Sequence, residues 1–285
     1  MRSSSKPPFK PAAKMASAAL RPAFPVRLSP GASRLNVTKI IADNARPAWA
    51  IGINNIKNAG NAVAPAGVGL DSQAVRERMV RKLAAQGVSD ARVLAAMGLV
   101  ERHRFVDTAL ANQAYEDTSL PIGLGQTISK PNVVARMLEL LRGGALAADG
   151  KLGRVLEIGT GCGYQAAVLS HLAAEVYSME RLRGLHDKAR ENLRTLRLPN
   201  VHLLFGDGMA GFPKGAPYAA IIAAAGGQAI PPAWIEQLAP GGRLVAPMHT
   251  VGGAQALVVL DKTAQGVRQT VLEAVHFVPL KSGTS

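Results

Sequence analysis

Residues Val155 to Tyr164 join an apolar run to a glycine-rich turn and form the strongest local motif of the chain. The segment reads VLEIGTGCGY, so glycine stands at positions 159, 161 and 163. Glycine lets a ligand approach the backbone closely, and amide groups that enter a helix from such a turn can bind polar ligand atoms. Tyr164 stands where a dinucleotide fingerprint needs its third glycine, and no Gly-Lys-Ser/Thr sequence follows. The motif therefore disfavours a pyrophosphate ligand and excludes a P-loop.

Three carboxylates stand at or near the ends of successive expected strands, where open α/β sheets bind ligands. Glu157 lies two residues before the first glycine, Glu180 ends the next strand, and Asp207 ends the third. These acids can accept bonds from an amino group, a ribose and an adenine amino group, respectively. One such acid alone is more often a cap, but the ordered set describes an adenosine with an amino-acid tail and no phosphate. We expect S-adenosylmethionine as the cofactor, bound by Glu157, Gly159, Thr160, Gly161, Glu180, Asp207 and Gly208.

A second motif precedes the glycine turn, and through it the chain resembles the bacterial protein-L-isoaspartate (D-aspartate) O-methyltransferases. The family hallmark LPIG-x-GQTIS-x-P-x-x-VA matches Leu120 through Ala135. Further similarity covers RFVD (104–107), VLEIGTGCGYQ (155–165), the GDG triplet, PPAWIEQLAPGGRLVAPM (231–248) and VHFVPL (275–280). The resemblance extends over roughly residues 71–282 and leaves the first seventy residues unmatched.

The resemblance implies an enzyme that methylates the free carboxylate of L-isoaspartyl residues, and also D-aspartyl residues, in damaged proteins and peptides. The methyl ester would then close to a succinimide, whose hydrolysis returns some normal aspartyl product. It further implies that Ser129 is the active-site residue and that Gln126 and Thr127 lie beside cofactor and substrate. The C-terminal VPL segment would help to hold the peptide.

The chemistry of the reaction agrees with a serine in this role. A carboxylate with an ordinary pKa near 4 is ionised at neutral pH, so it needs no general base to attack a methyl sulfonium. The enzyme must instead align the reacting atoms and exclude water. No G-x-S-x-G elbow surrounds Ser129 and no histidine adjoins it in sequence, which argues against a Ser-His-Asp triad. We expect Ser129 to act as a hydrogen-bond donor that positions the carboxylate.

Short apolar segments alternate with helical ones after residue 150, which is typical of an α/β fold. We expect strands at 154–158, 175–180, 201–207, 218–225, 242–248 and 256–261 and a last strand within 271–280. Helices are expected at 181–196 and 232–238, among others. The pattern predicts a Rossmann-like methyltransferase fold with about seven strands in a mixed sheet, an antiparallel edge, helices on both faces and an N-terminal helical subdomain.

Residues 71–150 precede this core and are expected to form the helical subdomain. The segment 71–87 has an apolar face and ends at Gly87, and Ser89 is expected to cap the next helix. Pro121–Ser129 is expected to be a loop because of its two glycines, and a helix follows Pro131. Residues 1–70, rich in Ala, Pro, Ser and Gly, are expected to be a disordered extension of a methyltransferase domain at 71–285, whose cofactor-binding core is 151–285.

The net charge of +14 belongs mainly to that extension. Residues 1–70 carry ten Lys/Arg and one acid, which leaves 23 Lys/Arg and 18 acids for the remainder. We expect no specific nucleic-acid partner. The sequence contains no run of eighteen or more apolar residues, so it predicts no membrane-spanning helix. The six histidines are not spaced like metal ligands, so no metal site is expected. The only cysteine, Cys162, cannot form an intramolecular disulfide, which fits the reducing cytoplasm. We also expect a monomer. The first seventy residues lack the Arg-faced amphipathic helix of an organelle transit peptide.

Two alternatives stay open at this point. A methyltransferase acting on a small molecule or a nucleic acid would share the cofactor half, whereas the loop at Leu120–Pro131 and the missing Asn/Asp-Pro-Pro-aromatic motif argue against it. A non-catalytic adenosine sensor is disfavoured by Ser129 and the three acids. The chain departs from the family pattern at Ala223–Gln228 and at Met248–His249, which puts the details of substrate packing in doubt.

Overall fold

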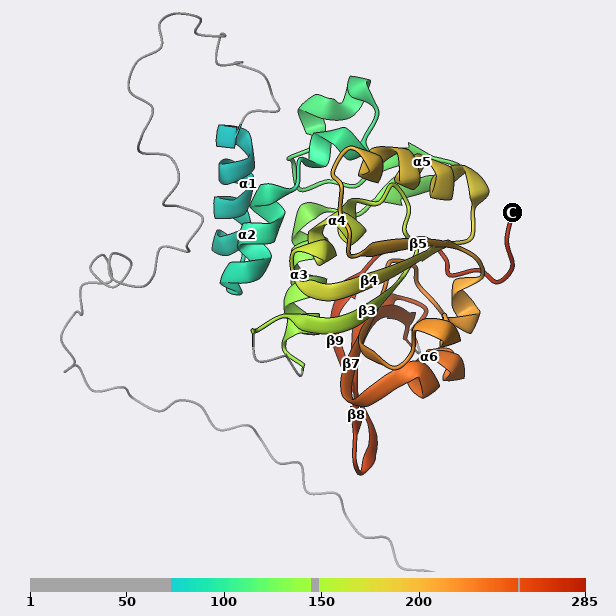
Figure 1. Cartoon of the computed structure of the whole chain (residues 1–285). Helices are drawn as coiled ribbons and strands as arrows, with labels where there is room; N and C mark the ends of the chain where they lie inside the picture. Colours follow the sequence, from blue (N-terminus) through green and yellow to red (C-terminus); the bar gives the residue numbers. More distant parts are fainter. Residues whose placement is uncertain (1–72, 145–148, 251) are drawn as a thin grey trace, which may run out of the picture. The chain divides into compact units, whose positions relative to one another are not determined.

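The computed structural model describes residues 73–144, 149–250 and 252–285, and the expected disordered extension at 1–70 lies outside these ranges. The described part is built around one seven-stranded sheet with helices on both sides (Figure 1). None of the helices in the described ranges has the length and apolar character needed to cross a membrane.

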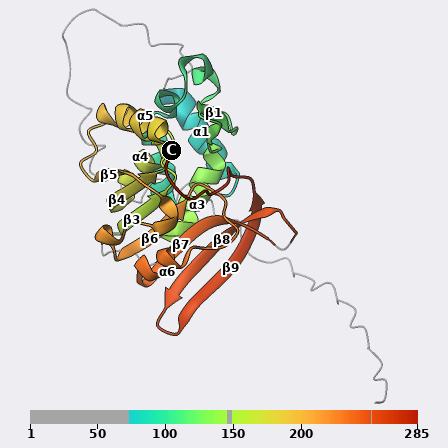
Figure 2. The same cartoon turned by 90° about the vertical axis from the view of Figure 1, so that its right-hand side faces the viewer.

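The sheet has the strand order β5-β4-β3-β6-β7-β8-β9. Neighbours from β5 to β7 run parallel, whereas β7–β8 and β8–β9 are antiparallel. Figure 2 shows the antiparallel pair β8–β9 at one edge of the sheet. This architecture confirms the predicted mixed sheet. The strands are β3 (Leu152–Ile158), β4 (Ala173–Glu180), β5 (Val201–Phe205), β6 (Tyr218–Ala223), β7 (Leu238–His249), β8 (Gln255–Thr263) and β9 (Gly266–Val275).

Alternate residues of the central strands pack into two separate cores because successive side chains of a strand point to opposite faces. Val155 of β3 belongs to the core beneath helices α3 (Pro131–Arg142), α4 (Tyr164–Ser170) and α5 (Arg183–Arg194). Leu156 and Ile158 belong to the other core, which contains Trp234 of α6 (Pro232–Gln237). The short 3₁₀ turns η5 (Gly208–Ala210) and η6 (Pro213–Gly215) lie between β5 and β6 along the chain. The strand order reverses between β3 and β6, so this doubly covered sheet has its switch point beside the glycine turn.

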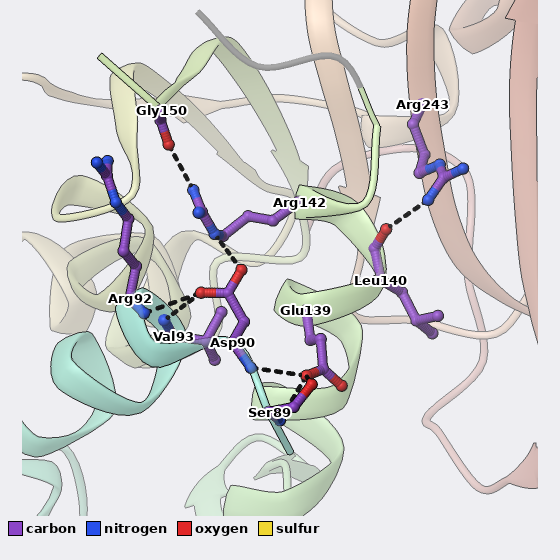
Figure 3. Close-up of polar contacts among 9 residues, drawn as sticks. All are labelled: Ser89, Asp90, Arg92, Val93, Glu139, Leu140, Arg142, Gly150 and Arg243. Carbon is purple, nitrogen blue, oxygen red and sulfur yellow. Dashed lines mark hydrogen bonds and ion pairs between the residues drawn. The ribbon is translucent and has the colours of Figure 1, made fainter. Parts of the chain in front are cut away.

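The first two helices of the described chain are α1 (Gln73–Ala85) and α2 (Ala91–Leu99), as predicted. The predicted N-cap of α2 was wrong by one residue. Asp90 is the cap, because its carboxylate accepts bonds from the backbone N–H groups of Arg92 and Val93 at 2.9 and 3.1 Å. The Ser89 hydroxyl instead donates to Glu139 of α3 at 2.9 Å (Figure 3). A tertiary contact thus decides which of two competent residues caps the helix.

The segment expected to be a loop, Pro121–Ser129, is instead largely a small antiparallel hairpin. Strand β1 (Leu120–Gly123) pairs with β2 (Gln126–Ile128), and Leu124 at the tip adopts a positive φ of 52°. Leu120, Ile122 and Ile128 are buried, which supplies the apolar face that a short hairpin needs. The chain reaches this hairpin through the 3₁₀ helices η3 (Arg102–Phe105) and η4 (Thr108–Gln113).

The last strand lies earlier than expected, because β9 ends at Val275. The following VPL segment leaves the sheet edge and pairs with the turn after β6. Gly226 donates its N–H to the carbonyl of Val278 and accepts from the N–H of Leu280, both at 2.8 Å. The final residues continue to the start of α5, where the N–H of Ser285 donates to the carbonyl of Arg181 at 3.0 Å. The C-terminal residues thus run across the edge of the sheet where the parallel strands end.

Candidate active site

The glycine turn follows β3 directly and enters α4, as the sequence predicts. Gly161 and Gly163 have φ angles of 57° and 90°, a region that residues with a side chain rarely adopt. A Cβ atom on Gly163 would also lie 3.0 Å from Cδ1 of Leu193. Both the backbone conformation and the close packing of α5 therefore require glycine here.

A cavity of about 390 Å³ opens at this turn. Its wall comes from several separate segments, among them the hairpin, the glycine turn, the end of β4, the start of η5 and the C-terminal residues. Eight predicted site residues line it, namely Gln126, Thr127, Ser129, Gly159, Thr160, Gly161, Glu180 and Gly208. The structure thus brings together predicted residues as far apart in the chain as Gln126 and Gly208.

Glu157 does not line this cavity, although the sequence suggests a direct contact with the cofactor. Its side chain is fully buried behind the turn, where the Ser178 hydroxyl donates to Oε2 at 2.5 Å. Burial raises the pKa of the Glu157 carboxyl to about 8. The Ser178 oxygen also lies 2.7 Å from the hydroxyl oxygen of Thr160, which does face the cavity. Glu157 can therefore influence the cavity through Ser178 and Thr160.

Glu180 lies where the sequence places it, at the end of β4 and on the cavity wall. Its two carboxylate oxygens accept bonds from the backbone N–H groups of Gly161 and Leu182, both at 2.9 Å. A carboxylate has about four acceptor positions, so two of them stay available for hydroxyl donors. The contacts hold Glu180 in one orientation against the glycine turn.

Asp207 is held by backbone groups and does not line the cavity, whereas its neighbour Gly208 does. One oxygen of Asp207 accepts from the N–H of Met209 at 2.8 Å, and the other accepts from the N–H of Gly283 at 2.7 Å. The C-terminal tail therefore lies over the carboxylate that the sequence assigns to an adenine contact. Gly208 packs so closely that an added Cβ would meet Cγ2 of Ile158 at 2.5 Å.

Ser129 lies directly after β2, where the hairpin meets the cavity. It also borders a second cavity of about 340 Å³, lined by Lys130, Val133 and the segment Ala274–Val278. The two cavities share Thr127, Ser129, Ala224 and Val278 as wall residues. The serine thus stands at the boundary between a space beside the glycine turn and a space beside the C-terminal segment.

Several wall residues were not among those predicted. Gln165 lines the first cavity, and its buried side chain interacts with the carboxyl of Glu157. Leu124, Lys281 and Ser285 also line it. Gln165 stands in the matching segment at 155–165 and could have been found there, but nothing local in the sequence indicates that the last residue reaches this wall.

The departure from the family pattern at Ala223–Gln228 reaches both cavities, whereas Met248 and His249 line neither. Ala224 donates its N–H to the carbonyl of Ile158 at 2.8 Å and forms part of both cavity walls. Gly227 donates to the carbonyl of Pro247 at 3.2 Å and accepts from the N–H of His249 at 2.9 Å. The two departing segments therefore contact one another, and small residues at 223–227 allow this close backbone packing.

The residues around the first cavity fit S-adenosylmethionine. Glycines with positive φ angles, the fixed carboxylate of Glu180 and the polar side chain of Thr160 match a hydroxyl-bearing ligand with an amino-acid tail. The cavity also lies at the switch point of a doubly covered sheet, where ligands of open α/β folds bind. The fold and the cavity together define a Rossmann-like methyltransferase.

Comparisons with known proteins give the family. The model of the protein-L-isoaspartate(D-aspartate) O-methyltransferase family matches residues 74–285, and the chain belongs to this family. It is 64% identical to a protein-L-isoaspartate O-methyltransferase from Methylibium petroleiphilum over 227 residues, which cover 79% of this chain and 84% of the relative. A second relative with that name, from Burkholderia vietnamiensis, is 52% identical over 91% of this chain and 84% of its own length.

Solved structures agree with this assignment. A protein-L-isoaspartate O-methyltransferase superposes with a TM-score of 0.64 at 29% identity, covering 73% of this chain and 66% of that one. A Plasmodium falciparum protein described as a putative member, in complex with S-adenosyl-L-homocysteine, gives a TM-score of 0.61 at 22% identity. It covers 72% of this chain and 98% of its own, and it supports the fold alone. The predicted family, fold class, methyltransferase activity and S-adenosylmethionine cofactor are confirmed.

Proposed function

We propose that this chain methylates the free carboxylate of L-isoaspartyl and D-aspartyl residues in damaged proteins and that Ser129 positions that carboxylate. The observation that carries the proposal is the place of Ser129, which borders the glycine-turn cavity and the adjoining cavity at once. A hydroxyl at this boundary can donate to a carboxylate oxygen that enters from the second cavity.

The cofactor occupies the first cavity in this proposal. When bound, S-adenosylmethionine supplies an electrophilic methyl group on a sulfonium. Gly159, Thr160, Gly161, Glu180 and Gly208 form its wall together with Gln126 and Thr127. Glu180 accepts bonds from hydroxyl groups, while Glu157 and Asp207 act from behind the wall, through Thr160 and Gly208.

The residues around Ser129 align the reactants and exclude water. The hairpin places Ile122 and Leu124 over the cavity beside the glycine turn. An ionised carboxylate is nucleophilic without a base, so alignment and water exclusion are what the protein must add. The methyl ester is neutral, and its methoxy group leaves far more readily than an oxide leaves the free carboxylate. The nitrogen of the neighbouring backbone amide then attacks the ester carbonyl, loses its proton and expels the methoxy group as methanol, which closes a succinimide without further help from the enzyme.

The second cavity supports a polypeptide substrate. It runs along Ala274–Val278, whose backbone leads into the VPL segment, and it carries Lys130 and His276 but no carboxylate among its wall residues. A groove of this composition accepts an anionic group without like-charge repulsion. A chain that passes through it would bring a side-branch carboxylate to Ser129.

The cellular setting is part of the same proposal. We infer a cytoplasmic monomer without a specific nucleic-acid partner, whose helical subdomain (71–150) and cofactor core (151–285) follow residues 1–70, which lie outside the described ranges. The large exposed apolar residues of the described ranges are Leu99 on α2, Leu124 at the hairpin tip, and Val267 and Val271 on β9, so they fall on three elements. This scatter supports a monomer. Light scattering on the purified protein measures its mass directly.

The substrate is tested by transfer of a radiolabelled methyl group from S-adenosylmethionine to an isoaspartyl peptide. The same peptide with a normal aspartyl residue is the control. We expect label on the isoaspartyl peptide alone. Equal label on both peptides, or label on neither, would contradict the proposed function.

The role of Ser129 is tested by Ser129→Ala. A hydrogen bond to a charged group contributes about 1.5–3 kcal/mol, so kcat/KM for the peptide should fall about 10- to 150-fold while cofactor affinity stays. Thr195→Ala removes an exposed hydroxyl that lines neither cavity and should leave kcat/KM unchanged. Unchanged activity in Ser129→Ala would remove the serine from the proposal.

A further inference from the structure

Arg102 connects the 3₁₀ helix η3 to the active-site serine. Its side chain is fully buried. Its Nε donates to the backbone carbonyl of Ala114, and its Nη2 donates to the backbone carbonyl of Ser129, both at 2.7 Å. One rigid guanidinium thus ties the chain before the hairpin to the residue that ends it.

The charge of Arg102 has no carboxylate close enough to form an ion pair within the described ranges. Burial lowers the pKa of the guanidinium and outweighs a side-chain hydrogen bond to Tyr164 and the charge of Asp117, which favour its charged form. The guanidinium carbon lies over the ring of Tyr164, 4.8 Å from the ring centroid, and Tyr164 lines the first cavity. A cation–π contact offsets only part of the cost of burying a charge. A buried positive charge that forms no ion pair within the described ranges therefore lies against Tyr164 of the cavity wall.

Arg102 contacts Ser129 directly but lines neither cavity, so it cannot touch the substrate itself. The Ser129 carbonyl that it holds belongs to the residue whose hydroxyl borders both cavities. Misplacing a reacting group by about 1 Å can lower a rate about 100-fold. The bond to the Ser129 carbonyl limits rotation of the serine backbone. Only the planar guanidinium of an arginine can bind two carbonyls in this way, because lysine and neutral side chains lack its fixed set of donors.

We propose that Arg102 is a positioning residue: its guanidinium fixes the backbone of Ser129, and its buried positive charge attracts the carboxylate of the substrate. The proposal rests on the function proposed for Ser129 and adds a specific division of labour. The fork geometry of Arg102 serves alignment and hence kcat, whereas its charge serves substrate binding and hence KM.

The test compares Arg102→Lys with Arg102→Met in the full-length enzyme. Lysine keeps the charge but loses the fork, so kcat should fall about 100-fold while KM for the isoaspartyl peptide changes less than about threefold. Methionine loses both, so KM should rise about tenfold as well. The dissociation constant of S-adenosylmethionine should stay within about twofold in both variants.

Arg142→Lys is the matched control (Figure 3). Arg142 is also a buried arginine, and it binds Asp90 and the carbonyl of Gly150, but it lines neither cavity. This variant should lower the midpoint of urea unfolding and leave kcat and KM unchanged. The comparison separates a loss of stability from a loss of alignment.

The outcomes distinguish this inference from the proposed function. Failure of the wild-type enzyme to label the isoaspartyl peptide contradicts the function itself. Normal labelling by the wild type with an unchanged kcat in Arg102→Lys overturns only the role of Arg102. Loss of cofactor binding and of the circular dichroism spectrum in Arg102→Lys also overturns it, because the residue would then be purely structural.

Discussion

Arg142 at the end of α3 binds Asp90 at the start of α2, with 2.8 Å between Nε and Oδ2 (Figure 3). The same aspartate caps α2 with its other oxygen, and Glu139, one turn earlier on α3, accepts bonds from the backbone N–H groups of Ser89 and Asp90. The start of one helix is therefore held by side chains from the end of another. Because α3 follows Ser129 by two residues, this contact also steadies the element behind the active site.

Asp90→Ala should destabilise the enzyme without changing its chemistry. Loss of the N-cap costs about 1 kcal/mol, and leaving the guanidinium of Arg142 partly unpaired adds about 1–3 kcal/mol. Urea unfolding should show a lower midpoint, whereas kcat of the folded enzyme should stay the same. Asp187→Ala, at a half-exposed position on α5, is the control and should leave the midpoint in place. An unchanged midpoint in Asp90→Ala would mean that the contact contributes nothing.

The central strands and the glycine turn could be predicted from the sequence because their signals are local. Apolar runs of strand length and three closely spaced glycines determine β3 and the turn after it. The hairpin at β1–β2 was missed because the Gly-Leu-Gly tip conceals the alternation of Leu120 and Ile122. Its apolar face becomes apparent only when Ile128 is known to lie opposite Leu120.

The placement of the acids shows where local signals end. Glu180 lines the cavity as predicted, because the end of a strand beside the glycine turn can place its side chain in few positions. Asp207 is also at its expected strand end, but the amide that occupies it belongs to Gly283, 76 residues later in the chain. Contacts of this kind depend on where a tail without regular structure passes, and no periodicity in the sequence records that path.

Glu157 should make stability depend on pH. Burial raises its pKa in the folded enzyme from 4.5 to about 8, so the folded state binds a proton that the unfolded chain releases between these values. The stability that this proton confers is complete below pH 4.5 and is lost as the pH rises towards 8. Glu157→Gln keeps an acceptor for Ser178 and removes the titration.

The measurement is the urea midpoint of the enzyme and of Glu157→Gln at about pH 5 and pH 8. The midpoint of the wild type should fall relative to the variant at the higher pH. Glu191→Gln, at an exposed position on α5, should follow the wild type at both values. Parallel profiles for wild type and Glu157→Gln would show that Glu157 does not bind the extra proton.

Gly208→Ala should weaken both stability and cofactor binding. The added Cβ would lie 2.5 Å from Cγ2 of Ile158, and overpacking of this kind costs about 1–3 kcal/mol. Because Gly208 lines the cavity, the shift should raise the dissociation constant of S-adenosylmethionine about tenfold. Gly252→Ala is the matched control, since its Cβ meets nothing within 4 Å. Equal dissociation constants in both variants would show that Ile158 and its neighbours move aside for the added Cβ without changing cofactor binding.

Removal of Gly283–Ser285 tests whether the C-terminal tail completes the cofactor cavity. Ser285 lines that cavity and exchanges backbone hydrogen bonds with Arg181 and Arg183 at 3.0 and 2.8 Å. Without the tail, the wall beside Glu180 is open to water, so KM for S-adenosylmethionine should rise about tenfold. The kcat at saturating cofactor should stay near the wild-type value, since Ser129 and the second cavity are untouched. The opposite result, tighter cofactor binding after truncation, would mean that the tail occupies the adenosine position and competes with the ligand for Asp207.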